Sequence, residues 1–89
     1  MINRLLVCAR MPKTIFSAGQ ERLLKLLRDE REKAGLTQVE LANKLGVPQS
    51  FVSKVESGER RVDLVELQSI CRALGTSLVK FVQSFEKGT

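Results

Sequence analysis

Short polar side chains gather on one face of a predicted helix between residues 48 and 57, where a single lysine carries the only charge on that face. At about 100° per residue these side chains share one arc, and two valines share the opposite arc. A glutamine amide can bind adenine through two hydrogen bonds, lysine can donate to guanine, and serine can bind base edges or phosphates. The chemistry fits the major groove of DNA. The polar arc consists of Gln49, Ser50, Ser53, Lys54 and Ser57.

A tight turn separates this helix from a shorter predicted helix over residues 38–45. The helical pattern is interrupted at Gly46 and Pro48. Glycine tolerates the left-handed conformation that ends a helix, and proline is common where the next one begins. Because the connection is short, we expect the second helix to cross the first at a large angle and to project its polar arc outward.

Start and stop signals predict five helices in one small all-α domain over residues 17–86. Three capping pairs, each a Ser, Thr or Asp three residues before Gln or Glu, mark helix starts, and glycines mark helix ends. The capping pairs are Ser17 with Gln20, Thr37 with Glu40 and Asp63 with Glu66, and the glycines are Gly35, Gly46, Gly58 and Gly75. The predicted helices cover residues 18–34, 38–45, 48–57, 64–74 and 77–85.

Apolar residues recur at helical spacing through these segments and predict a single shared core. Residues 1–16 are expected to form an N-terminal extension, as a short strand or partly disordered, and residues 87–89 a tail. The expected core residues are Leu23, Leu27, Leu41, Ala42, Leu45, Val52, Val55, Leu67, Ile70, Cys71, Leu74, Leu78, Phe81 and Val82.

The composition limits the chemistry available to the chain. With no histidine and only two cysteines, it lacks the ligands of a structural zinc site and the usual general base for a nucleophile. We therefore expect a non-enzyme without cofactor or metal. The net charge of +5 is compatible with a polyanionic partner. No apolar run is long enough for a membrane span or a secretory signal, so we expect a cytoplasmic protein with reduced thiols.

The pattern of residues 28–58 resembles the Cro/C1-type helix-turn-helix family, also called the Xre family of transcriptional regulators. The resemblance extends over residues 18–85 and implies a compact five-helix, phage-repressor-like domain, prokaryotic or phage-encoded, with its helix-turn-helix motif at residues 38–57. The matching pattern is Arg28-x-x-Arg31-x-x-x-Gly35-Leu36-Thr37-Gln38-x-Glu40-Leu41-Ala42-x-x-Leu45-Gly46-Val47-x-Gln49-Ser50-x-Val52-Ser53-x-Val55-Glu56-x-Gly58.

The resemblance implies a base-reading role for several residues. Gln49 and Ser50 correspond to base-reading positions, Lys54 to a further one a turn later, and Pro48 to a position that can touch a thymine methyl group. Gln38 corresponds to a residue that contacts a phosphate and braces the first glutamine of the reading helix.

Other positions are expected on the phosphate backbone or inside the fold. The resemblance implies phosphate contacts for Arg60 and Arg61, and the geometry of the polar arc places Ser53 and Ser57 on the backbone side. It also implies a structural salt bridge between Arg31 and Glu56. Phe51 departs from the small or polar residue common at its position, and it could shield the helix edge, meet a sugar or methyl group, or touch a protein.

The sequence therefore predicts a sequence-specific regulator of transcription that binds double-stranded DNA, a repressor acting as a homodimer on a palindromic operator, without a separate ligand-sensing domain. The last helix is the first expected dimer element, through Leu78, Phe81, Val82 and Phe85, and the apolar N-terminal segment is the second. One alternative is an antitoxin that neutralises a toxin and represses its own promoter. Another is an adaptor that uses the same fold to bind a protein.

Overall fold

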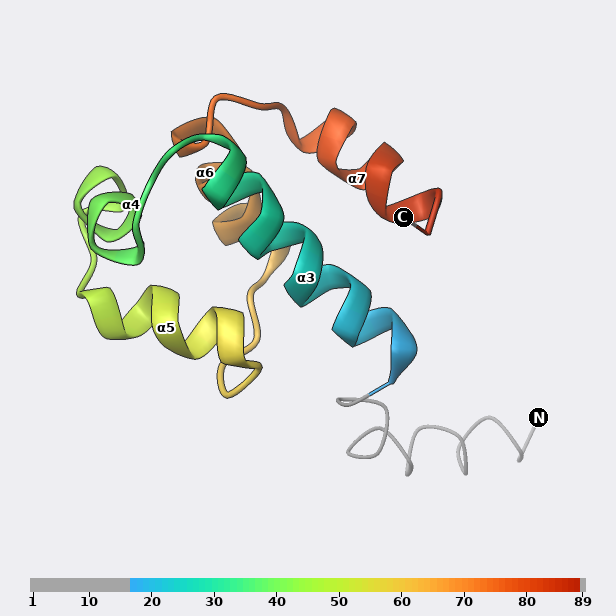
Figure 1. Ribbon diagram of the computed structural model, residues 1–89, viewed down its shortest axis with the longest axis horizontal. Helices are drawn as coiled ribbons and strands as arrows, with labels where there is room; N and C mark the ends of the chain where they lie inside the picture. Colours follow the sequence, from blue (N-terminus) through green and yellow to red (C-terminus); the bar gives the residue numbers. More distant parts are fainter. Residues whose placement is uncertain (1–16, 89) are drawn as a thin grey trace.

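The computed structural model describes residues 17–88, which form five α-helices and no strand (Figure 1). All five predicted helices are confirmed to within one residue at each end. The prediction for residues 1–16 lies outside the described part of the chain. None of the described helices is long and apolar enough to cross a membrane. The helices are α3 (Ala18–Lys33), α4 (Gln38–Leu45), α5 (Gln49–Ser57), α6 (Leu64–Ala73) and α7 (Leu78–Glu86).

Side-chain caps fix where the helices begin. The Thr37 hydroxyl accepts a hydrogen bond from the Glu40 amide at 3.0 Å, and the Glu40 carboxylate accepts one from the Thr37 amide at 2.9 Å. Asp63 forms the same reciprocal capping box at the start of α6. The prediction of a third box at Ser17 is wrong in one half, since its hydroxyl caps the amide of residue 20 but no return bond forms.

Gly58 ends α5 in a conformation that few other residues tolerate. Its φ is +87°, and a Cβ atom at this position would stand 3.1 Å from a methyl carbon of Leu24 on α3. Any side chain here would therefore strain the backbone and crowd the contact between α3 and α5. Gly46, with φ +72°, ends α4 in the same left-handed conformation and makes the tight turn into α5.

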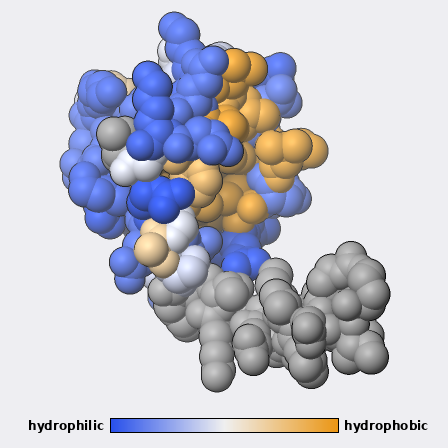
Figure 2. Space-filling model, turned by 90° about the vertical axis from the view of Figure 1, so that its right-hand side faces the viewer, coloured by the Kyte–Doolittle hydropathy of each residue, from blue (hydrophilic) through white to orange (hydrophobic). Residues whose placement is uncertain are grey.

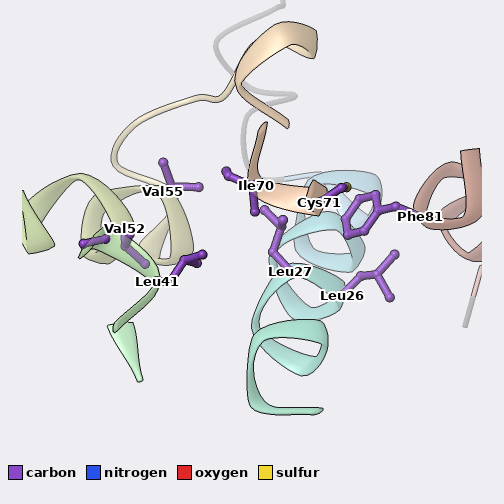
Figure 3. Close-up of a cluster of buried hydrophobic side chains, with 9 residues drawn as sticks. Leu26, Leu27, Leu41, Val52, Val55, Ile70, Cys71 and Phe81 are labelled. Atoms are coloured by element: carbon purple, nitrogen blue, oxygen red, sulfur yellow. The ribbon is translucent and has the colours of Figure 1, made fainter. Parts of the chain in front are cut away.

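The helices enclose one apolar core. α4 packs on α5 and α6, α3 packs on α5 and α7, and α6 packs on α7. Figure 3 shows side chains from all five helices in one continuous band, from Val52 and Leu41 at one end, past Leu27 and Ile70, to Phe81 at the other. The buried apolar residues are Leu26, Leu27, Leu41, Ala42, Val52, Val55, Ile70, Cys71 and Phe81.

Most of the predicted core is confirmed, with one error and one omission. Val82 is 39% exposed and does not belong to the core, whereas Leu26 is buried and was not predicted. The Cys71 thiol is fully enclosed, and this burial raises its pKa, which keeps the thiol neutral and unreactive.

Candidate nucleic-acid interface

α5 divides cleanly into a buried face and an exposed face. Val52 and Val55 are each 3% exposed and anchor the helix in the core. Gln49, Ser50 and Lys54 are exposed on the other side. Pro48, also exposed, precedes the helix in an extended conformation and leaves its first turn without a side-chain cap. The four residues that are predicted to read bases are thus all accessible.

A neighbouring helix holds the side chain of Gln49 in place. The Gln49 amide nitrogen Nε2 donates to Oε1 of Gln38 at 2.8 Å. In turn, Nε2 of Gln38 donates to Oε1 of Glu56 at 3.0 Å. Gln38 is the first residue of α4, so the two helices of the motif are linked side chain to side chain at the outward edge. This is the bracing that the family resemblance implies.

Arg31 and Glu56 form a buried ion pair behind this edge. Arg31 Nε donates to Glu56 Oε2 at 2.7 Å, and Nη2 donates to Oε1 at 3.1 Å. A third bond runs from Nη1 to the carbonyl oxygen of Leu36 at 2.8 Å. The hydrogen bond to Glu56 raises the pKa of Arg31. The structure thus ties α3, the loop before α4 and the reading helix together through one guanidinium group.

Arg60 is engaged within the protein, in an arrangement that the sequence did not suggest. Its guanidinium donates to both carboxylate oxygens of Glu66, at 2.9 and 3.1 Å, and to the carbonyl oxygen of Arg61 at 2.9 Å. It also lies 4.5 Å from the centroid of the Phe51 ring. A phosphate contact would therefore compete with Glu66 for this arginine, and the phosphate role predicted for Arg60 stays a prediction.

The same cluster explains Phe51. Its ring is half-buried, packs against the core and carries the Arg60 guanidinium on one face, a favourable cation–π geometry. Of the three roles considered for Phe51, shielding of the helix edge is the one that these contacts support. Arg60 and Glu66 are six residues apart on a loop and a helix, and no periodicity in the sequence signals that they meet.

The other residues that are predicted to contact DNA phosphates differ in how accessible their side chains are. Arg61 and Lys54 are exposed, and no salt bridge joins either to another residue within 17–88. The Ser57 hydroxyl donates to the carbonyl oxygen of Lys54 at 3.1 Å, so it closes the last turn of α5. Ser53 is half-buried on the edge of the polar arc. Among residues 17–88, Arg61 and Lys54 are therefore cations beside the reading face that no salt bridge engages.

α7 presents a different set of apolar side chains from the one predicted for a dimer. Phe81 is only 3% exposed and packs in the core, so it offers no surface to a partner, and the prediction is wrong for this residue. Leu78 and Phe85 are half-buried against the core. Val79, which is not among the predicted dimer residues, is 66% exposed, and Val82 is 39% exposed. Figure 2, which views the side where α7 lies in Figure 1, shows apolar side chains gathered in one area.

Comparisons with known proteins agree with this geometry. A family model described as Helix-turn-helix matches residues 27–81. Control protein C.MunI of Mycoplasma sp is 33% identical over 63 residues, which cover 71% of this chain and 85% of that protein. The solved structure of an XRE-family like protein from Pseudomonas syringae pv. tomato str. DC3000 superposes with a TM-score of 0.78 at 46% identity, covering 90% of this chain and 98% of that one.

A second solved structure is similar over a comparable length. A mutant of the Restriction-Modification Controller Protein C.Esp1396I superposes with a TM-score of 0.74 at 25% identity, covering 81% of this chain and 96% of that chain. The family model, which matches residues 27–81, spans α4, α5 and α6 together with part of α3 and part of α7.

Proposed function

Since this chain belongs to the Cro/C1-type helix-turn-helix family of DNA-binding transcriptional regulators, we propose that it is a sequence-specific repressor that binds a palindromic operator as a homodimer. One observation carries the proposal: an exposed arc of amide, hydroxyl and ammonium groups on a helix whose other face is locked in the core. Two of the similar proteins are named control or controller proteins, which is consistent with a regulatory role.

α5 is the helix that enters the major groove under this proposal. Gln49 and Ser50, near its N-terminus, contact base edges, Lys54 contacts a base one turn later, and Pro48 lies against a thymine methyl group. The structure supports this assignment because these residues are exposed on one side of the motif.

Phosphate contacts surround this reading face. We assign them to Arg61 first, because its side chain is exposed and free of any ion pair with a described residue. Gln38, Ser53 and Ser57 border the same face, and Lys54 can reach a phosphate as well as a base. Arg60 would have to release Glu66 before it could join them.

α7 is the proposed dimer element. Val79 and Val82 expose apolar surface, and Leu78 and Phe85 lie half-buried beside it. A domain of this size reads only a few base pairs, so two reading helices spaced about 34 Å apart would raise both affinity and specificity. Pairing through α7 would leave α5 free, since α5 packs on α3 and α4 whereas α7 lies on the other side of α3 (Figure 1).

Selection of bound duplexes from random DNA tests the proposal. The wild-type chain is expected to enrich a palindrome. Gln49→Ala should lose about 1–3 kcal/mol of discrimination at one or two positions in each half-site. Arg61→Ala, the matched variant at a phosphate-side position, should weaken binding to all sequences equally and flatten the salt dependence.

Three results would contradict the proposal or a part of it. Folded protein that enriches no sequence would favour the protein-binding adaptor. An enriched site without two-fold symmetry would leave the DNA-binding function in place and remove the homodimer. Equal effects of Gln49→Ala and Arg61→Ala on every sequence would show that reading and phosphate contact are not divided between these residues.

A further inference from the structure

Four side chains form one hydrogen-bonded line from the core to the reading face. The line runs from Arg31 on α3 to Glu56 on α5, then to Gln38 on α4, and ends at Gln49 on α5. The donor–acceptor distances along it are 2.7, 3.0 and 2.8 Å. The first pair is buried, Gln38 is half-buried and Gln49 is exposed. The line therefore connects a fixed internal charge pair to an amide at the surface.

Each bond in this line has only one permitted direction. Arginine can only donate, and a carboxylate paired with it can only accept. Gln38 must therefore turn its NH₂ group toward Glu56, which directs its carbonyl oxygen at Gln49. That oxygen can only accept, so Gln49 must turn its own NH₂ group inward. A glutamine in isolation could flip its amide by half a turn, but here the buried ion pair excludes the flipped form.

The direction of the line determines what Gln49 offers to a ligand. One N–H group of Gln49 is used by Gln38, so its second N–H group and its carbonyl oxygen remain, in a fixed order. Adenine presents an acceptor, N7, beside a donor, N6, in the major groove, whereas guanine presents two acceptors, N7 and O6. One N–H group beside one carbonyl oxygen matches adenine and mismatches guanine.

We infer that Arg31 and Glu56 are positioning residues for base recognition: through Gln38 they fix the amide direction of Gln49 and thereby select adenine in one orientation. This inference rests on the proposed function of α5 as a reading helix. It adds a role in base specificity to an ion pair that otherwise serves to join α3 to α5.

Reversing the direction of the hydrogen bond between residues 38 and 49 is the sharpest test. Gln38→Lys replaces the amide with a group that only donates, so it can still bind Glu56 but must attract the carbonyl oxygen of Gln49. Gln49 would then expose both N–H donors. We expect the preferred base at the Gln49 position to change from adenine to guanine in competition assays with duplexes varied at that position. The change should vanish when Gln49→Ala is added.

Two further variants distinguish control of the Gln49 amide orientation from simple support of the Gln49 side chain. Gln38→Met leaves the Arg31–Glu56 pair intact and removes the link, so the preference for adenine should fall by about 2- to 10-fold, the equivalent of one ordinary hydrogen bond. Glu56→Gln replaces an acceptor with a group that can bond either way, and it should give a similar loss if the variant folds. Retention of the full adenine preference in Gln38→Lys and Gln38→Met would overturn the inference.

A measurement without DNA distinguishes failure of this inference from failure of the proposed function. In the NMR spectrum of the free protein, one side-chain amide proton of Gln49 should lie downfield of those of the exposed Gln68 and Gln83. The shift should disappear in Gln38→Met. If it is present but the wild-type chain selects no sequence, the proposed function fails. If selection succeeds and the shift is absent, the orientation by Gln38 fails.

Discussion

Two arginine–glutamate pairs hold the reading helix, one behind it and one beyond its end, and they differ chiefly in their exposure to water. Arg31 and Glu56 have side chains that are 10% and 6% exposed, whereas those of Arg60 and Glu66 are 42% and 30% exposed. Both pairs are bidentate, with nitrogen–oxygen distances between 2.7 and 3.1 Å. The two pairs therefore have similar hydrogen-bond geometry, but one lies in the protein interior and the other lies in contact with water.

Because of this difference in exposure, the two pairs contribute differently to the stability of the fold. A buried charge that loses its partner cannot be compensated by water, so the inner pair constrains the packing of its helices strongly. An exposed pair is screened by water and salt, and pairs of this kind contribute little alone. The outer pair has additional support, because the Phe51 ring covers one face of Arg60 and is itself anchored at the edge of the core.

The largest expected effect follows from breaking the inner pair on one side only. Arg31→Ala should lower the free energy of unfolding by about 3–5 kcal/mol, because the Glu56 carboxylate would stay buried without its cation. Urea denaturation at one fixed protein concentration measures this loss, since dimerisation would otherwise shift the midpoint. The matched control is Lys25→Ala, which breaks a pair that is 70% and 45% exposed and should cost about 1 kcal/mol or less.

A double replacement sharpens the same comparison. Replacing Arg31 with Met and Glu56 with Leu together removes both charges, and the double variant should be at least about 2 kcal/mol more stable than Arg31→Ala. If the single and double variants were equally unstable, packing rather than an unpaired charge would explain the loss. Because the hydrogen-bonded line from Arg31 to Gln49 is interrupted in the double variant, this variant should still bind DNA but with a reduced preference for adenine.

The next effect concerns the ring beneath the outer pair. Phe51→Ala should cost roughly 2 kcal/mol, below the 3–5 kcal/mol typical of a fully buried phenylalanine, because the ring is half-exposed. Phe51→Leu restores apolar volume without an aromatic face and should recover most of this loss in the same denaturation assay. No recovery in Phe51→Leu would mean that the aromatic face over which Arg60 lies matters more than apolar packing.

The contrast between the pairs also marks what the sequence could predict. Helix positions follow from local signals, such as the Thr37–Glu40 capping box and the glycines, and these signals act within a few residues. The exposure of Gln49 and the burial of Val52 follow from helical periodicity. The inner pair, 25 residues apart, is predictable only from the family resemblance, because no local rule relates positions so distant.

The details that escaped prediction depend on tertiary placement. Arg60 has a basic side chain in a loop, and its sequence context alone does not distinguish a phosphate contact from a bond to Glu66. Phe81 and Val82 are adjacent on α7, and both fitted a wide apolar stripe, but in the packing of α7 on α3 and α6 the first is buried and the second is exposed. The packing of the helices, rather than the apolar pattern, decides which of the two belongs to the core.

The smallest expected effect is the response of the outer pair to acid. The hydrogen bond from Arg60, followed by that from the Asp63 amide, lowers the pKa of Glu66. The stabilisation from the ionised carboxylate is therefore complete above the ordinary glutamate pKa of about 4.3. It is lost as the pH falls through the lower pKa of the folded state.

Arg60→Met removes the principal cause of this shift, so the decline in stability on acidification should be shallower in this variant than in the wild type. Arg61→Met is the matched control, since it removes one positive charge from the neighbouring position and leaves the Arg60–Glu66 pair in place. Thermal unfolding followed across this acidic range compares the three proteins. The Asp63 amide still binds Glu66 in Arg60→Met, so part of the decline should persist. Equal slopes in the two variants would show that the outer pair, unlike the inner one, contributes nothing measurable to the folded state.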